Sequence, residues 1–117
     1  RWMRRIRLMV IGPPPYLSPV VRQAWSRAEI DLEGPYNSRD FASKLVDASF
    51  DGAIIDVEYD AATLLQVVEV LDAFAVPAIF AGSGRAAPGG GYALSRDQEA
   101  MNAIVRSLLG SEANTMQ

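Results

Sequence analysis

The amino-acid sequence predicts a single doubly wound α/β domain, in which a five-stranded parallel sheet lies between two layers of helices. Short apolar runs of strand length alternate five times with segments whose apolar residues recur every three or four positions. This order implies parallel strands joined by right-handed crossovers, with helices on both faces of the sheet. At 117 residues, 50% of them hydrophobic, the chain can form one domain around its own core.

Five segments have the character of strands. Residues 52–57 are the clearest, because they are apolar on both faces, as a central parallel strand is. Residues 30–33 alternate and stop at Gly34-Pro35, which is typical of a short strand at the edge of a sheet. The remaining strands are expected at residues 6–11, 76–81 and 91–94, and the last is the weakest.

The helical segments have apolar faces and recognisable ends. Helices are expected over residues 17–28, 41–48, 60–74 and 101–109. Ser18 can cap the first of them, with Pro19 tolerated in its first turn, and Gly110 ends the last. Trp25 and Phe74 lie among aliphatic residues at helical spacing, so we expect both side chains to belong to the core.

We find no internal repeat or boundary, and therefore expect one domain over residues 1–110 followed by a disordered polar tail at 111–117. Arginines crowd the start of the chain. They are interpreted as a solvated leader into the first strand, with a basic binding arm as the alternative. These arginines are Arg1, Arg4, Arg5 and Arg7.

Composition excludes several classes of function. The chain has no cysteine and no histidine, which removes thiol catalysis, structural zinc and histidine acid–base chemistry. A net charge of −3 argues against nucleic acid as the main partner. No apolar run approaches the roughly 20 residues that span a bilayer, and no secretory pattern is present. We therefore expect a soluble, cytoplasmic protein.

In a doubly wound sheet, binding sites lie at the carboxyl ends of the strands. The residues expected there are Gly12, Asp56 and Gly82, each at the end of a predicted strand. Gly82-Ser83-Gly84-Arg85 superficially resembles a phosphate-binding loop but lacks the lysine and spacing of one. Gly12 is followed by prolines, which have no N–H to offer a phosphate, so the dinucleotide-binding turn is also missing.

The order of these segments resembles the receiver domain of response regulators, which has a flavodoxin-like fold. Residues 51–57 (Asp-Gly-Ala-Ile-Ile-Asp-Val) are similar to the receiver strand that presents the phospho-accepting aspartate, which would be Asp56. Residues 76–82 resemble the fourth receiver strand, which normally ends in a switch Thr or Ser. Residues 32–36 and 42–45 are similar to the second strand and helix of small alphaproteobacterial receivers. The resemblance covers residues 6–109.

The sequence departs from the receiver pattern at three of four expected elements. Receivers carry an acid pair for magnesium just after the first strand, where this chain has Gly12 and Pro13. Gly82 occupies the position of the switch hydroxyl, although Ser83 is adjacent. Ser95 lies nearest the position of the phosphate-pairing lysine. Asp56 alone remains.

Two further features weaken the receiver chemistry. The only lysine, Lys44, lies in the second predicted helix. The connection at residues 83–90 is shorter than the dozen or so residues that a parallel crossover with a helix needs. The fourth helix of the receiver fold is therefore expected to be reduced or absent, and that helix is part of the output face of receivers.

Three hypotheses follow, none of them with a catalytic residue. The first is a degenerate receiver: a non-enzymatic interaction module of two-component (phosphorelay) signalling, in which Asp56 caps the following loop. The second is a phospho-accepting receiver that uses Asp56, with Mg²⁺ held by Asp56 and Glu58 only in that case. The third is a small-ligand or nucleotide-binding α/β domain. Expected partners are a histidine kinase, an output domain or a second copy of the chain, and neither nucleic acid nor a membrane.

Overall fold

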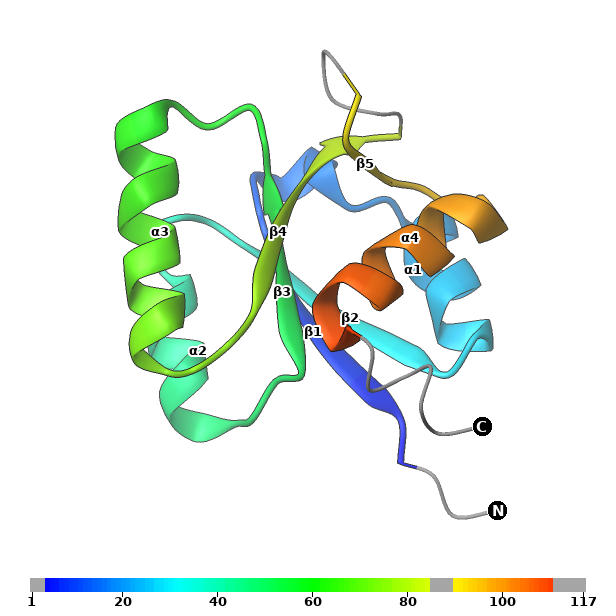
Figure 1. Ribbon diagram of the computed structural model, residues 1–117, viewed down its shortest axis with the longest axis horizontal. Coiled ribbons are helices and arrows are strands. Elements are labelled where there is room, and N and C mark those ends of the chain that lie inside the picture. The colour runs from blue at the N-terminus through cyan, green and yellow to red at the C-terminus, as the bar shows by residue number, and fades with distance from the viewer. Residues whose placement is uncertain (1–3, 85–89, 111–117) are drawn as a thin grey trace.

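The computed structural model describes residues 4–84 and 90–110, which form a five-stranded parallel sheet with helices on both faces (Figure 1). The strands, in the spatial order β2-β1-β3-β4-β5, are β1 (Ile6–Ile11), β2 (Ile30–Tyr36), β3 (Gly52–Asp56), β4 (Ala78–Ser83) and β5 (Tyr92–Leu94). The helices are η1 (Pro14–Tyr16, a 3-10 helix), α1 (Pro19–Arg27), α2 (Phe41–Asp47), α3 (Ala61–Ala73) and α4 (Gln98–Leu109). The predicted doubly wound, three-layer fold is confirmed.

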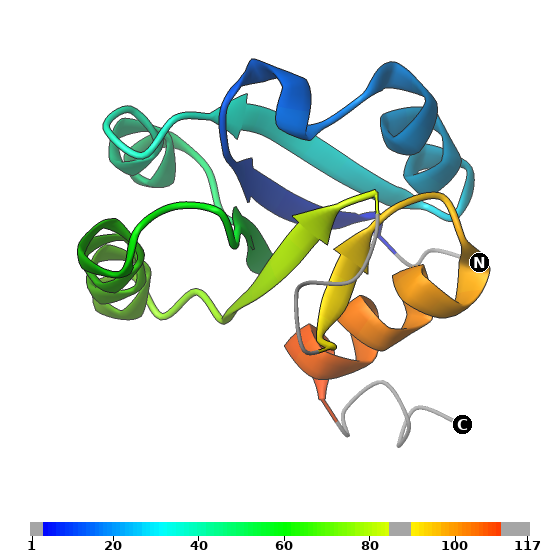
Figure 2. The same cartoon turned by 90° about the horizontal axis from the view of Figure 1, so that it is seen from above.

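The sheet divides the interior into two hydrophobic cores. Helices α1 and α4 cover one face, and α2 and α3 cover the other (Figure 2). Successive residues of the central strand β3 serve different cores: Ile54 packs with Trp25 of α1, and Ile55 packs with Leu71 of α3. Both faces of the strand are therefore apolar, which is the pattern that made this segment recognisable as a buried parallel strand.

Helix α1 begins and packs as its sequence predicts. The Ser18 hydroxyl accepts a hydrogen bond from the Val21 N–H at 3.2 Å, and Pro19 opens the first turn. Trp25 is fully buried, and its indole N–H donates to the Ser95 carbonyl at 2.8 Å. The expected core position of Trp25 is confirmed, and its polar atom has a partner, as a buried indole requires.

The expected core position of Phe74 is wrong, because its side chain is 46% exposed. Helix α3 ends one residue earlier, and the chain reverses there: the Val76 N–H donates to the Leu71 carbonyl and the Ala75 N–H to that of Asp72. This is the Schellman pattern, with Ala75 at φ +59°. Because this turn uses residues 74–76, β4 begins at Ala78, two residues later than predicted.

Strand β2 is the edge strand that was predicted, but it extends past Gly34-Pro35 to Tyr36. The pairing with β1 shifts register between Met9 and Ile11, which is how the strand accommodates the interruption. Gly34 has φ +126°, and a Cβ there would lie 2.5 Å from the Val10 carbonyl oxygen. Only glycine fits such a position.

Among the described residues, no helix joins β4 to β5. Eight residues separate these strands, and those of them that the structure describes, Gly84, Gly90 and Gly91, are not helical. The helix that the receiver pattern would place between β4 and β5 is absent from the described residues of this connection. Residues 85–89 lie outside the described part. On the sheet face shared with α2 and α3, Phe80 of β4 remains 39% exposed.

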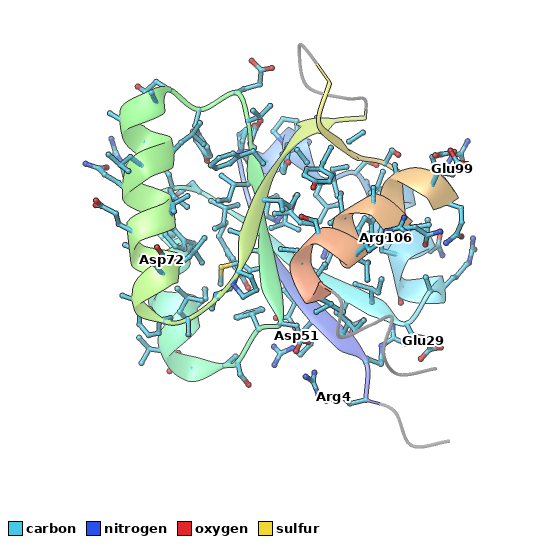
Figure 3. All side chains as sticks on the ribbon, in the orientation of Figure 1. Arg4, Glu29, Asp51, Asp72, Glu99 and Arg106 are labelled. Atoms are coloured by element: carbon cyan, nitrogen blue, oxygen red, sulfur yellow. The ribbon has the colours of Figure 1, made fainter. Side chains whose placement is uncertain are left out.

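The N-terminal arginines that the structure describes are not a solvated leader. Arg4 makes two hydrogen bonds to Asp51, at 2.6 and 2.9 Å, and Figure 3 shows these two side chains together below the sheet. Arg5 binds both carboxylate oxygens of Asp31, and Arg7 pairs with Glu33 at 2.7 Å. The arginines align β1 with its neighbours, because their partners lie on or beside the flanking strands β2 and β3.

Other sequence expectations fall outside this description. Arg1, Trp2 and the expected tail at 111–117 lie outside the described residues. Within the described residues, no helix combines the length and the hydropathy that crossing a bilayer requires.

Candidate functional site

The carboxyl end of β3 carries the only buried charged side chain of the described residues. Asp56 closes the strand, pairs in register with Ala81 of β4, and is 6% exposed. Burial of a carboxylate is costly unless it is hydrogen-bonded. The geometry around Asp56 therefore decides what this end of the sheet can do.

A tyrosine from the neighbouring loop occupies the space beside this carboxylate. After β1 the chain enters η1, where the Tyr16 N–H donates to the Pro13 carbonyl at 2.9 Å. Pro14 and Pro15 favour this tight turn because their φ angles are already fixed near the helical value. The turn points Tyr16 inward, and the residue is only 4% exposed.

The Tyr16 side chain crosses the end of β3. Its hydroxyl donates to the Ala81 carbonyl of β4 at 2.7 Å, and that carbonyl also accepts from the Val57 N–H at 3.3 Å. Because β3 lies between β1 and β4, a side chain that starts after β1 and bonds to β4 must pass over β3. Tyr16 thus spans the end of the strand that Asp56 closes, near enough for the Asp56 charge to raise the pKa of its phenol.

Gly12 is the residue that makes room for this tyrosine. A Cβ at position 12 would lie 2.6 Å from Cδ2 and 2.9 Å from Cβ of Tyr16, which is closer than real Cβ contacts come. Its N–H donates to the Tyr36 carbonyl of β2 at 2.9 Å. An acidic side chain at position 12, where receivers carry one, is therefore incompatible with the observed position of Tyr16. Pro13, the second position of the missing pair, is exposed.

The Asp56 carboxylate is engaged by the backbone. Its Oδ1 accepts a hydrogen bond from the Glu58 N–H at 2.9 Å, and its carbonyl accepts from the Tyr59 N–H at 3.3 Å. These bonds turn the chain from β3 toward Asp60, whose side chain caps α3 through the Thr63 N–H at 2.8 Å. Asp56 thus caps the loop that leads into the helix.

The two tyrosines near this carboxylate are held in their neutral forms. Burial raises the pKa of the Tyr16 phenol, and the negative charge of Asp56 and then Tyr59 act in the same direction. Burial also raises the pKa of Tyr59; hydrogen bonding to Ser38 opposes this, and the Asp56 charge adds to it.

The other positions of the receiver pattern have structural roles here. Gly82 is buried in β4, and the Ser83 hydroxyl donates to the Tyr16 carbonyl at 3.4 Å. The Ser95 carbonyl accepts from Trp25, while its hydroxyl accepts from the Asp97 N–H at 3.2 Å. Both serines therefore secure neighbouring loops.

The structure does not bring the proposed magnesium ligands together. Glu58 is exposed, and its contact with Asp56 is made through the backbone N–H and not the carboxylate. Among the described residues, no three Asp or Glu side chains gather into a group that could hold a cation. The buried carboxylate of Asp56 already accepts a backbone N–H through its Oδ1.

The chain's only lysine, the aromatic residue of β5 and the described part of the glycine-rich segment after β4 are not part of this site. Lys44 of α2 sits 5.5 Å from the ring centre of Tyr36, as a cation–π contact. Tyr92 of β5 packs against the core beneath α1 and α4. The glycine-rich segment that resembled a phosphate loop includes Arg85, which lies outside the described residues.

Comparisons of this chain with protein-family models, with curated proteins and with solved structures found no match.

The sequence interpretation overlooked Tyr16. The available signal was a glycine at the end of a buried strand, then three prolines, then an aromatic residue. That pattern indicates a short proline turn that directs a ring back over a residue with no side chain.

We predict that Gly12→Ala lowers the free energy of unfolding by about 1–3 kcal/mol, because the added methyl group overlaps the Tyr16 ring. Urea unfolding would measure this. In the background of Tyr16→Ala, which removes the ring, the same substitution should cost much less. An equal cost in both backgrounds would contradict the packing that we describe.

We further predict that stability falls at alkaline pH through Tyr16. Its pKa is raised in the folded protein, so the native state holds the phenol proton more tightly than the unfolded chain. Stability from this group is complete below the ordinary tyrosine pKa of about 10 and decreases above it, by up to about 1.4 kcal/mol per pH unit. Unfolding experiments should show a shallower alkaline loss in Tyr16→Phe. An unchanged slope would contradict the prediction.

Proposed function

We propose that this chain is a receiver-like interaction module of two-component (phosphorelay) signalling that works without phosphorylation. The carrying observation is the position of Tyr16 across the end of β3, bonded to Ala81 of β4. Support for a receiver-like origin comes from the 2-1-3-4-5 strand order with an aspartate closing β3. In this proposal the domain keeps the receiver fold, and Tyr16 occupies the space at the strand ends where a receiver binds its metal ion and phosphoryl group.

Charge supports a role without phosphoryl transfer. Phosphoryl transfer to a carboxylate depends on positioning and on cations that neutralise the developing charge. The chain's only lysine lies in α2 against Tyr36, and the acid-pair positions are Gly12 and Pro13. An acyl phosphate on Asp56 would add negative charge beside a buried phenol, and the described residues place no lysine there to neutralise it.

A non-enzymatic module acts through its surface. The expected partners are signalling proteins, such as a histidine kinase or an output domain, in the cytoplasm where phosphorelays operate. In this role Asp56 is a structural residue: it shapes the loop before α3 through the Glu58 N–H.

The proposal predicts that acetyl phosphate or beryllofluoride with Mg²⁺ leaves the chain unmodified. Intact-mass spectrometry would detect an acyl phosphate, and ¹⁹F NMR would detect a bound beryllofluoride. A phosphorylatable receiver treated in parallel is the positive control, and Asp56→Asn is the matched variant. A stoichiometric adduct on the wild type that Asp56→Asn abolishes would replace this proposal with a phospho-accepting receiver.

The alternative function, nucleotide binding, is tested separately by measuring whether nucleotides raise the melting temperature of the chain. A ligand that binds the native state at a hundred times its Kd raises the unfolding free energy by about 2.7 kcal/mol. No stabilisation by nucleotides is expected.

A further inference from the structure

An apolar groove lies between α2 and α3, on the outer side of the molecule and apart from the strand-end site. Its volume is about 640 Å³. The first turn of α2 forms one wall, and the second half of α3 forms the other. The lining side chains that matter here are Phe41, Ala42, Val70, Ala73, Phe74 and Glu69.

Aromatic and aliphatic surface is exposed in this groove. Phe74, the C-cap residue of α3, is 46% exposed. Val70, one turn earlier, is half-buried. Large apolar side chains grouped at a concave surface are typical of sites that bind another protein segment. The groove runs along two helices, which suits an inserted helix with apolar residues at every third or fourth position.

The α3 wall of the groove belongs to an acidic segment of the chain. Residues 45–84 contain no Lys or Arg, and their acidic side chains are Asp47, Asp51, Asp56, Glu58, Asp60, Glu69 and Asp72. Asp51 is neutralised by Arg4, and Asp56 is buried. The other five are exposed, and none forms an ion pair within the described residues.

One of these unpaired acids lines the groove. Glu69 is one of the lining residues, and Asp72 follows one turn later on α3 (Figure 3). None of the lining residues is basic; the nearest cations along the chain are Arg39, before α2, and Lys44, which faces the Tyr36 ring. A partner that approaches α3 therefore gains most if it is positively charged.

We propose that the α2–α3 groove binds an amphipathic helix of a partner protein, with aliphatic side chains in the groove and Lys or Arg beside Glu69 and Asp72. The proposal rests on the function proposed above and names the chemistry of the partner.

A second copy of this chain fits the groove poorly. On the opposite face, α4 buries Met101, Ile104 and Leu108 in the core. Val20 of α1 is the only large apolar side chain of α1 and α4 that is exposed among the described residues. One such side chain cannot fill the groove. A symmetric contact between two α2–α3 faces would bring their exposed acids together, and these repel each other. The occupant is therefore a different protein.

The test is a selection on the intact, immobilised chain from a displayed library of helical peptides about 16 residues long, randomised at all exposed positions. Enriched peptides should combine an apolar stripe with Lys or Arg. Their affinities are then measured by fluorescence anisotropy against Glu69→Lys, Phe74→Ser and the control Glu99→Lys. Glu99 is an exposed residue of α4 on the opposite face, so it undergoes the same charge change away from the groove (Figure 3).

Glu69→Lys should weaken binding about three- to fivefold, as the loss and reversal of an exposed ion pair does, with a smaller effect at high salt. Phe74→Ser should weaken it about tenfold through lost apolar contact. Glu99→Lys should change it less than twofold. Both groove substitutions are at exposed positions, and circular dichroism verifies that each variant is folded.

Three results of the selection would overturn the proposal: no enriched peptide, enriched peptides without basic residues, or equal losses for Glu69→Lys and Glu99→Lys. Dimerisation that Phe74→Ser abolishes would overturn it in favour of a second copy. An acyl phosphate on Asp56 would overturn only the proposed function, because the groove experiment is done without phosphodonor.

Discussion

The hydrogen bond from the Tyr16 hydroxyl to the Ala81 carbonyl is the interaction on which the strand-end site depends. It links the loop after β1 to β4 and holds a ring over the end of the strand between them. The bond itself contributes about 1 kcal/mol, and burial of the ring contributes more. Its larger consequence is spatial, because the ring requires glycine at position 12 and leaves no space for an acid there.

Under the proposed function, the departures from the receiver pattern belong to one connected arrangement. No acidic side chain stands at Gly12 or Pro13, and the Asp56 Oδ1 accepts a hydrogen bond from the Glu58 N–H. The serine beside the missing switch hydroxyl donates to the Tyr16 carbonyl, so it fastens the same loop. Ser95, at the other position compared with the receiver pattern, likewise bonds within the fold, to Trp25 and to the Asp97 N–H. The surface with unbalanced charge and exposed apolar groups lies elsewhere, along α2 and α3.

The fold was predictable because burial imposes a pattern on every element. Ile54 and Ile55 face different cores, so β3 is apolar on both faces up to Asp56. Ser18-Pro19 marks the start of α1 through local capping chemistry. Such signals depend on residues close in sequence.

The errors concern contacts between residues distant in sequence. Arg4 and Asp51 are 47 positions apart, and nothing local to Arg4 shows that it has a partner. Tyr16 finds its partner 65 positions away, which is why a proline turn was recognisable and its destination was not. Phe74 matched the apolar period of α3, but the Schellman turn ends the helix before that residue can turn inward. The sequence places Asp56 at the end of its strand. The residues around its side chain could not be predicted, because they include Tyr16, which is 40 positions away in the sequence.

The central claim is that the carboxyl end of β3 is closed and holds no divalent cation. Paramagnetic Mn²⁺, which takes the same oxygen ligands as Mg²⁺, tests it directly when added to isotopically labelled protein. The account predicts no saturable broadening of the amide signals of Gly12, Asp56 and Val57. Saturable, selective broadening centred on Asp56, lost in Asp56→Asn, would show a working metal site there and contradict the account.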